Sequence, residues 1–149
     1  MNNFSATETV YIGSDHAGFS LKETIVAFLK KDGKTVVDLG PFSIERTDYP
    51  DFARKVCSKV LETGSPGILI CGTGLGMSMC ANRHRGIRAA VCTHEFHALA
   101  TREHNNANIL CLGERITAPG LAMELVRIFL STPFTGGRHE ARVEKIELL

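Results

Sequence analysis

Cys71 is the residue whose type and position point most directly to chemistry. It ends the apolar run Ile68-Leu69-Ile70, and glycines follow it at positions 72, 74 and 76. A continuous apolar run is typical of a strand buried on both faces of a parallel sheet, and closely spaced glycines leave backbone N–H groups accessible. A helix predicted over residues 77–83 would point its positive end at this loop, which favours anion binding and ionisation of the thiol. We therefore interpret Cys71 as the candidate reactive group and the loop as an anion cradle.

Packing is the competing interpretation for any cysteine, because cysteine is among the most buried residue types. We expect only packing roles for the other four, Cys57, Cys80, Cys92 and Cys111. Cys71 differs because open α/β sheets bind ligands just outside the carboxyl ends of their strands, where this thiol and its glycine loop are predicted to lie.

Other polar side chains also follow the ends of predicted strands. The carboxyl ends of parallel strands meet at one edge of a sheet, so these side chains should converge on the glycine loop as an acid–base site in a ligand crevice. Taken singly, each has an ordinary explanation as a helix cap, a turn hydroxyl or a solvated loop residue. The residues are Asp15 and His16 after strand 9–13, Asp48 and Tyr49 beyond strand 35–39, Thr73, and His94 after strand 87–92.

Two polar clusters lie elsewhere in the chain. His104 and Asn105 follow a helix predicted over residues 95–103. In the tail, Arg138 and Arg142 are four apart, which places both on one face of a helix predicted over residues 138–146. Two guanidiniums so placed could hold a phosphate, although a solvated basic face is the alternative.

The elements that must position these residues alternate between strand and helix. Further helices are predicted over residues 21–31, 51–62 and 119–130, and the remaining strand over residues 108–112. With the central strand that ends at Cys71, this makes a five-stranded parallel sheet covered by helices on both faces, followed by a helical tail. We expect one domain over residues 1–149.

Composition argues against large charged partners. The chain has 17 basic and 16 acidic residues without a long run of either sign, so we expect neither nucleic acid nor membrane as a partner, and favour a small ligand. An odd number of cysteines without a Cys-x-x-Cys pair favours reduced thiols. No leader-like or membrane-spanning segment is evident, so we predict a cytoplasmic protein.

Other glycine-loop proteins fit the sequence less well. A dinucleotide site could use Gly72, Gly74 and Gly76 with Glu95 on the ribose, but the last glycine comes one residue too early. A nucleotide-hydrolase loop needs Gly-Lys-Ser/Thr, whereas Met77 follows Gly76. The same methionine stands where a cysteine phosphatase would need an arginine.

Five motifs stand out along the chain: Asp-His-Ala-Gly-Phe at 15–19, Glu-Arg-Thr-Asp-Tyr-Pro at 45–50, Cys-Gly-Thr-Gly-Leu-Gly-Met-Ser at 71–78, His-Asn at 104–105, and Gly-Gly-Arg-His at 136–139 with Arg-Val at 142–143. Together they resemble type B ribose-5-phosphate isomerase over nearly the whole chain. The family also includes galactose-6-phosphate isomerase subunits and allose-6-phosphate isomerases. The resemblance implies a Rossmann-like three-layer αβα sandwich, a homodimer or higher oligomer with active sites shared between subunits, and aldose–ketose isomerisation of a phosphorylated sugar without metal or cofactor.

The resemblance also implies roles for individual residues. Cys71 matches the base that moves a proton between C1 and C2, and His104 matches the residue assigned to ring opening, with Asp15 assisting. Thr73 and the backbone of Gly72, Gly74 and Gly76 match the anion hole. His16, Arg115, Arg138 and Arg142 match phosphate-binding positions, and Asn105, Asp48, Tyr49 and His139 match other substrate-binding positions.

Overall fold

The computed structural model describes residue 4 and residues 9–148 of the chain. Five strands in this part form one sheet in which every neighbouring pair is parallel, in the order β2-β1-β3-β5-β4. Their bounds are β1 Val10–Ser14, β2 Val36–Asp38, β3 Gly67–Cys71, β4 Ala89–Val91 and β5 Ile109–Gly113.

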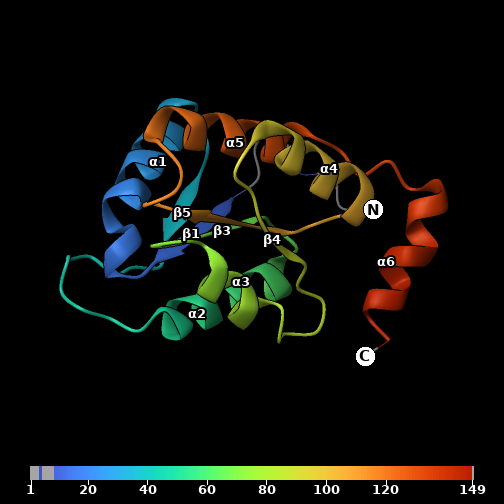
Figure 1. The fold of residues 1–149 in the computed structure, drawn as a ribbon, viewed down its shortest axis with the longest axis horizontal. Helices are drawn as coiled ribbons and strands as arrows, with labels where there is room; N and C mark the ends of the chain where they lie inside the picture. The colour runs from blue at the N-terminus through green and yellow to red at the C-terminus, as the bar shows by residue number, and fades with distance from the viewer. Residues whose placement is uncertain (1–3, 5–8, 149) are drawn as a thin grey trace.

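Helices connect the strands, because parallel neighbours can be joined only by a crossover. Figure 1 shows α1, α4 and α5 on one face of the sheet, α2 and α3 on the other, and α6 beyond one end. The predicted Rossmann-like three-layer αβα sandwich is confirmed. The bounds are α1 Phe19–Lys31, α2 Tyr49–Thr63, α3 Leu75–Ala81, α4 Glu95–Asn105, α5 Pro119–Ser131 and α6 Glu140–Ile146, with 3₁₀ turns η1 His16–Gly18 and η2 Gly137–His139.

The sheet separates two apolar clusters. Side chains that alternate along β3 contribute to both: Ile68 and Ile70 pack with α1 and α5, whereas Leu69 and Cys71 pack with α2 and α3. All five residues of β3 are buried, as the continuous apolar run predicts. This central strand therefore holds Cys71 at a fixed position on the carboxyl edge of the sheet.

α2 and α3 both begin earlier than predicted, as does α1, which begins at Phe19 rather than at residue 21. α3 covers residues 75–81 rather than 77–83, so Gly76 lies in the first helical turn and not in the loop. α2 begins at Tyr49, two residues before the predicted start, since a proline such as Pro50 is compatible with the first turn of a helix. Both changes bring predicted site residues onto helix starts.

The tail corrects one prediction. Gly136 and Gly137 have φ values of 64° and 58°, which lead into a tight 3₁₀ turn that contains Arg138, and α6 begins only at Glu140. The prediction that Arg138 and Arg142 lie on one helix is therefore wrong.

A side chain forms hydrogen bonds with the outer side of the edge strand β4. Asn82, the residue after α3, accepts a hydrogen bond from the Ala89 N–H at 2.8 Å and donates one to the Ala89 carbonyl at 2.9 Å. The amide thus takes the place that a neighbouring strand would occupy.

Two negative findings apply to residue 4 and residues 9–148. None of their helices is long and apolar enough to cross a membrane. They also contain no group of three or more His, Cys, Asp or Glu side chains placed to hold a metal ion.

Candidate active site

A cavity of about 300 Å³ opens at the carboxyl edge of the sheet. It lies where β1 and β3 end next to each other and where the start of α2 approaches the glycine loop. The predicted convergence of strand-end residues is therefore seen for most of the set. The lining residues are Asp15, His16, Ala17, Tyr49, Cys71, Gly72, Thr73, Gly76 and Arg115.

The sulfur of Cys71 accepts a hydrogen bond from a backbone amide. The Gly74 N–H donates to Cys71 Sγ at 3.1 Å, and the thiol is only 6% exposed. Gly74 can present its amide in this way because its φ is 79°, a left-handed conformation that favours glycine. The loop thus fixes the sulfur beside the cavity.

The other thiols have different surroundings. Burial raises the pKa of Cys57 to about 12, with Cys80 contributing, and burial raises the pKa of Cys92 to about 12. The pKa of Cys111 is also raised well above its ordinary value, mainly by burial. Cys80 is half-buried, and its thiol approaches the Pro50 carbonyl at 3.9 Å. These contacts agree with packing roles for all four.

The lack of a side chain at Gly72 and Gly76 leaves room for two different neighbours. A Cβ at Gly72 would lie 3.3 Å from Arg115 Cζ, so the guanidinium lies directly over this glycine. A Cβ at Gly76 would lie 2.8 Å from Tyr49 Cζ, so the phenol ring covers the first turn of α3. The absent side chains make room for a cation on one side of the loop and for an aromatic ring on the other.

Asp15 and His16 form the wall next to β1. Asp15 Oδ1 accepts hydrogen bonds from the Ala17 and Gly18 N–H groups at 2.9 and 3.1 Å, which caps η1. His16 is held by Thr47, whose Oγ1 accepts the His16 backbone N–H at 3.2 Å and whose own N–H donates to His16 Nδ1 at 3.2 Å. His16 Nδ1 also lies 3.2 Å from the Thr47 carbonyl oxygen, so Thr47 offers this nitrogen a partner in either tautomer of the ring.

Arg115 is positioned by the loop after β5. Its backbone N–H donates to the Gly72 carbonyl at 3.0 Å, and its side chain is exposed toward the cavity. The preceding residue, Glu114, accepts the Leu21 N–H at 2.9 Å through Oε2, which joins this loop to the first turn of α1. Arg115 and His16 give the cavity two nitrogen donors suited to an anion.

The remaining site predictions gather at the end of α4. The His104 ring stacks on His139, with centroids 4.5 Å apart, and His104 Nε2 lies 3.9 Å from Glu103 Oε2. Desolvation and the nearby His104, Arg138 and Arg142 lower the pKa of His139.

The arginines of the tail, Arg138 and Arg142, are exposed and form no ion pair within the described residues. Asn105, the last residue of α4, is exposed as well.

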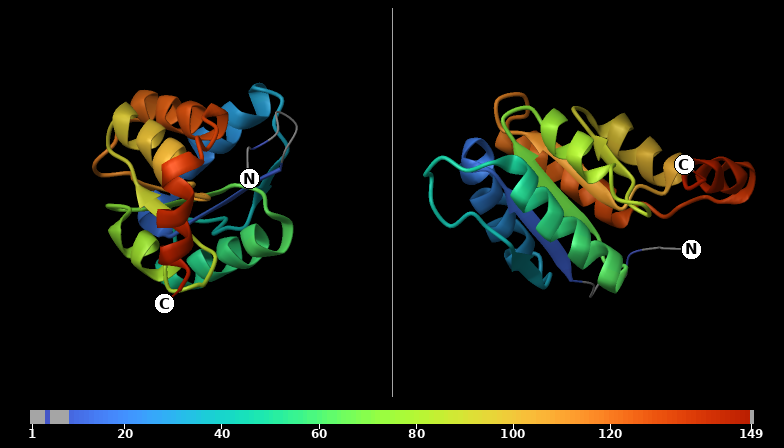
Figure 2. Two further views of the ribbon diagram at one scale, coloured as in Figure 1. Left: turned by 90° about the vertical axis from the view of Figure 1, so that its right-hand side faces the viewer. Right: turned by 90° about the horizontal axis from the view of Figure 1, so that it is seen from below.

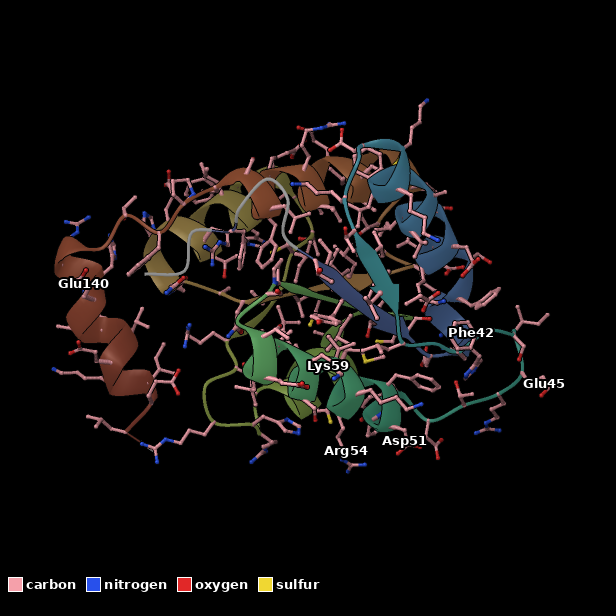
Figure 3. All side chains as sticks on the ribbon, turned by 180° about the vertical axis from the view of Figure 1, so that it is seen from behind. Phe42, Glu45, Asp51, Arg54, Lys59 and Glu140 are labelled. Atoms are coloured by element: carbon pink, nitrogen blue, oxygen red, sulfur yellow. The ribbon has the colours of Figure 1, made fainter. Side chains whose placement is uncertain are left out.

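The residues around Cys71 and the residues around His104 lie at opposite ends of the folded molecule. The residues after α4 enter the sheet at its amino edge, where the Gly67 N–H donates to the Asn108 carbonyl, whereas Cys71 lies at the carboxyl edge. In Figure 2, α6 stands at one end of the molecule and the loop before α2 at the other. Figure 3 shows the same separation between Glu140 on α6 and Glu45 on that loop. His104, Asn105, Arg138, His139 and Arg142 therefore do not reach the Cys71 cavity of their own chain.

Three predicted residues lie at the carboxyl edge but do not line the cavity. Asp48 is exposed at the N-cap position of α2, and Gly74 is buried behind Cys71. His94 is exposed at the start of α4, where the centroid of its ring lies 3.7 Å from that of His97.

Sequence reasoning assigned no role to Thr47 or Glu114, the residues that hold His16 and α1. Each acts through a contact that spans a long stretch of sequence, 31 positions in the case of Thr47 and 93 in the case of Glu114. Two signals could have pointed to them: Glu114 lies two residues after the strand predicted over residues 108–112, and Thr47 lies within the motif at 45–50.

Known proteins share both the sequence and the fold. The family described as Ribose/Galactose Isomerase matches residues 10–146. Ribose-5-phosphate isomerase B of Escherichia coli K12 is 46% identical over 138 residues, which cover 92% of this chain and 93% of that protein. A solved ribose 5-phosphate isomerase of Thermotoga maritima has a TM-score of 0.94 and 51% identity, and the match covers 95% of this chain and 99% of that one.

A Mycoplasma genitalium ribose-5-phosphate isomerase B solved with bound ribulose-5-phosphate is also similar. It has a TM-score of 0.90 and 44% identity, with 93% of each chain covered. The chain is similar to these proteins in both sequence and fold over almost their full length. The chain belongs to the ribose/galactose isomerase family.

Proposed function

We propose that this chain interconverts ribose 5-phosphate and ribulose 5-phosphate, as one isomerase domain acting in the cytoplasm. The observation that carries the proposal is the cavity in which a buried thiol accepts a backbone N–H beside His16 and Arg115. The isomerase names of the relatives, and the ribulose-5-phosphate bound in one of them, support the reaction and the substrate. Five cysteines without a disulfide among the described residues support a reducing compartment.

Cys71 acts in this proposal as the base that carries a proton between C1 and C2. Removal of a proton beside a carbonyl produces an enediolate, whose oxygens need hydrogen-bond donors. The first backbone N–H groups of α3 have no partner within the helix, and one oxyanion donor typically contributes about 3–4 kcal/mol. Thr73, whose hydroxyl accepts the Leu75 N–H at 3.3 Å, completes this wall of the site.

The phosphate is the remote group that orients the sugar. His16 and Arg115 bind it from one side, and Arg138 and Arg142 from the other. Asp15 and His104 open the furanose ring, while the other members of the set contact the sugar hydroxyls. That set comprises Asp48, Tyr49, Asn105 and His139, with the Gly72, Gly74 and Gly76 loop beneath.

A second copy of the chain supplies the group at the end of α4. A head-to-tail pairing would bring His104 and the tail arginines of one subunit to the Cys71 cavity of the other. Exposed apolar side chains suited to such an interface occur on α3, α4 and α6, namely Leu75, Met79, Phe96 and Ile146. We infer a homodimer with two shared sites, open to further assembly.

The direct test is turnover of both pentose phosphates by the purified chain. We expect interconversion in both directions that is unaffected by a chelator, since the described residues offer no metal-binding cluster. Absence of pentose turnover would contradict the proposal.

Hexose phosphates form the second candidate, because the family description includes galactose. Galactose 6-phosphate and allose 6-phosphate therefore belong in the same panel, and a larger kcat/KM for either would assign the chain to the hexose branch. A dinucleotide fits less well, because the third glycine of the loop comes one residue too early for that site; tight dinucleotide binding without sugar turnover would favour it instead.

A further inference from the structure

Lys22 is a lysine whose side chain is completely buried, close to the candidate site but outside its lining. It lies in the first turns of α1, and its exposed fraction is 0%. The Nζ atom lies 2.5 Å from Asp38 Oδ2 and 3.0 Å from Glu23 Oε1. Two aromatic rings enclose the ammonium, with Phe19 at 5.2 Å and Phe42 at 5.4 Å from ring centroid to Nζ.

A buried ion pair of this kind is poorly explained by stability. The loss of hydration offsets most of the attraction between the charges, and a well-packed apolar pair is often as stable. What the pair does provide is a fixed geometry between the elements that carry the two charges. The role of Lys22 therefore follows from the elements that its contacts hold in place.

The contacts of Lys22 lead directly to the loop between β2 and α2. Asp38 ends β2, and its other oxygen, Oδ1, accepts the Gly40 N–H at 2.8 Å. The Gly40 carbonyl accepts the Ser14 N–H at 2.9 Å at the end of β1. Phe42, an exposed residue of this loop, lies beside α1 (Figure 3). Its ring is one of the two that enclose the Lys22 ammonium. One end of the loop is thus fastened to both α1 and β1.

The other end of the same loop leads to two residues that line the cavity, His16 and Tyr49. Thr47 makes two hydrogen bonds to His16, and Tyr49 covers Gly76. Between Phe42 and Thr47 the side chains are exposed, so the loop itself provides little packing to fix its path. The path of the loop toward the cavity then depends on its two fastened ends.

We propose that Lys22 is a positioning residue for substrate binding, acting through Asp38 and the loop of residues 39–48 on His16 and Tyr49. It touches no reacting atom. Its effect should fall mainly on KM, because His16 and Tyr49 bind the substrate while Cys71 belongs to a separate strand. The kinetic part of this proposal rests on the proposed isomerase function.

The test uses a double variant, Lys22→Met with Asp38→Asn. Both charges disappear together, so no buried charge is left unpaired, and the asparagine oxygen can still accept the Gly40 N–H. The control is Ile25→Val, a fully buried residue on the same helix, whose loss of a methylene should lower stability. Ile25 belongs to an apolar cluster that includes no residue of the loop 39–48.

Two readouts are measured for each protein. Amide hydrogen exchange of His16 and Thr47 reports the loop contact without any substrate, with the Gly67 N–H at the far edge as internal reference. Steady-state kinetics with ribose 5-phosphate gives KM and kcat. In the double variant we expect faster exchange at His16 and Thr47 and a KM raised about tenfold with kcat within about threefold. Ile25→Val should change neither.

The outcomes separate the two proposals. Unchanged exchange at His16 and Thr47, or faster exchange with an unchanged KM, would overturn the positioning role of Lys22. Equal effects in Ile25→Val would do the same, since they would reduce the result to general destabilisation. A wild-type protein without isomerase activity would instead refute the proposed function, and the exchange measurement would still test whether Lys22 fixes the loop.

Discussion

The sulfur of Cys71 accepts a backbone N–H, whereas burial in apolar surroundings is the main influence on Cys57, Cys92 and Cys111. Burial raises the pKa of these three thiols, so they stay protonated at neutral pH. One of five chemically identical side chains is therefore set apart by its place at a strand end and by the conformation of Gly74.

Replacement of Cys71 distinguishes catalysis from packing. Loss of a general base typically lowers kcat by about 100- to 10,000-fold, so Cys71→Ala should lose that much while stability falls by only about 1 kcal/mol. Cys71→Ser should also be poor, because a hydroxyl is far less acidic than a thiol. The measurements are kcat and Tm, with Cys80→Ala as the control. Retention of more than about a tenth of wild-type kcat in Cys71→Ala would refute the base assignment.

His139 should make stability depend on pH. Its pKa is lowered in the folded protein, so the unfolded chain binds the proton more readily. The stability that neutral His139 contributes is fully present above its unfolded pKa of about 6.5. It is lost as pH falls from that value through the lowered pKa of the folded protein.

The Tm of the wild type should therefore fall more steeply below neutral pH than that of His139→Gln. His97→Gln provides the control, since His97 also contacts a second imidazole but lies at the start of α4, away from the tail arginines. Parallel Tm profiles for wild type and His139→Gln would contradict the effect.

Helix α3 shows how the start of an element shapes the cavity. Gly76 lies in its first turn, where alanine would favour the helix by up to about 1 kcal/mol. A Cβ at this position would nevertheless meet the Tyr49 ring at 2.8 Å and displace it. We expect Gly76→Ala to keep or raise Tm and to raise KM, as measured by thermal melting and steady-state kinetics.

Gly120→Ala is the matched control for this prediction. Gly120 lies in the first turn of α5, and an added Cβ would meet no atom within 4 Å. This variant should gain a little stability and keep its KM. An unchanged KM in Gly76→Ala would show that the Tyr49 ring does not bind substrate.

Local patterns predicted the elements well but not the contacts between them. The apolar run before Cys71 identifies β3 because a doubly covered strand needs little else to be recognised. The Lys22–Asp38 pair and the Thr47–His16 contact depend on how β2, α1 and the loop pack, and no spacing in the sequence encodes that packing. The start of α6 was missed because Gly136 and Gly137 favour a 3₁₀ turn over a continuous helix.

At the scale of the whole molecule, the separation of the two residue groups makes the shared site testable by mixing. Cys71→Ala and His104→Ala should each be nearly inactive alone. In a mixed dimer, one cavity would carry both substitutions and the other would be intact. Random subunit exchange should then restore about a quarter of wild-type activity.

The control for this complementation is a mixture of Cys71→Ala with Cys71→Ser, in which no cavity regains its base. Activity after exchange that stays at the level of the separate variants would show that each site is built within one chain. Size-exclusion chromatography with light scattering should first establish that the protein is at least dimeric.

The side chain of Asn82 also bears on contacts between separate molecules. β4 is an outer strand of the sheet, and an outer strand with unpaired backbone groups can recruit a strand from another molecule. Because the Asn82 amide forms hydrogen bonds with both the N–H and the carbonyl of Ala89, these two groups cannot pair with a strand from another molecule. Asn82→Ala should therefore form aggregates earlier on mild heating than wild type at equal concentration, as followed by light scattering and thioflavin fluorescence. The asparagine would then act less as a brace for its own fold than as a barrier between neighbouring molecules.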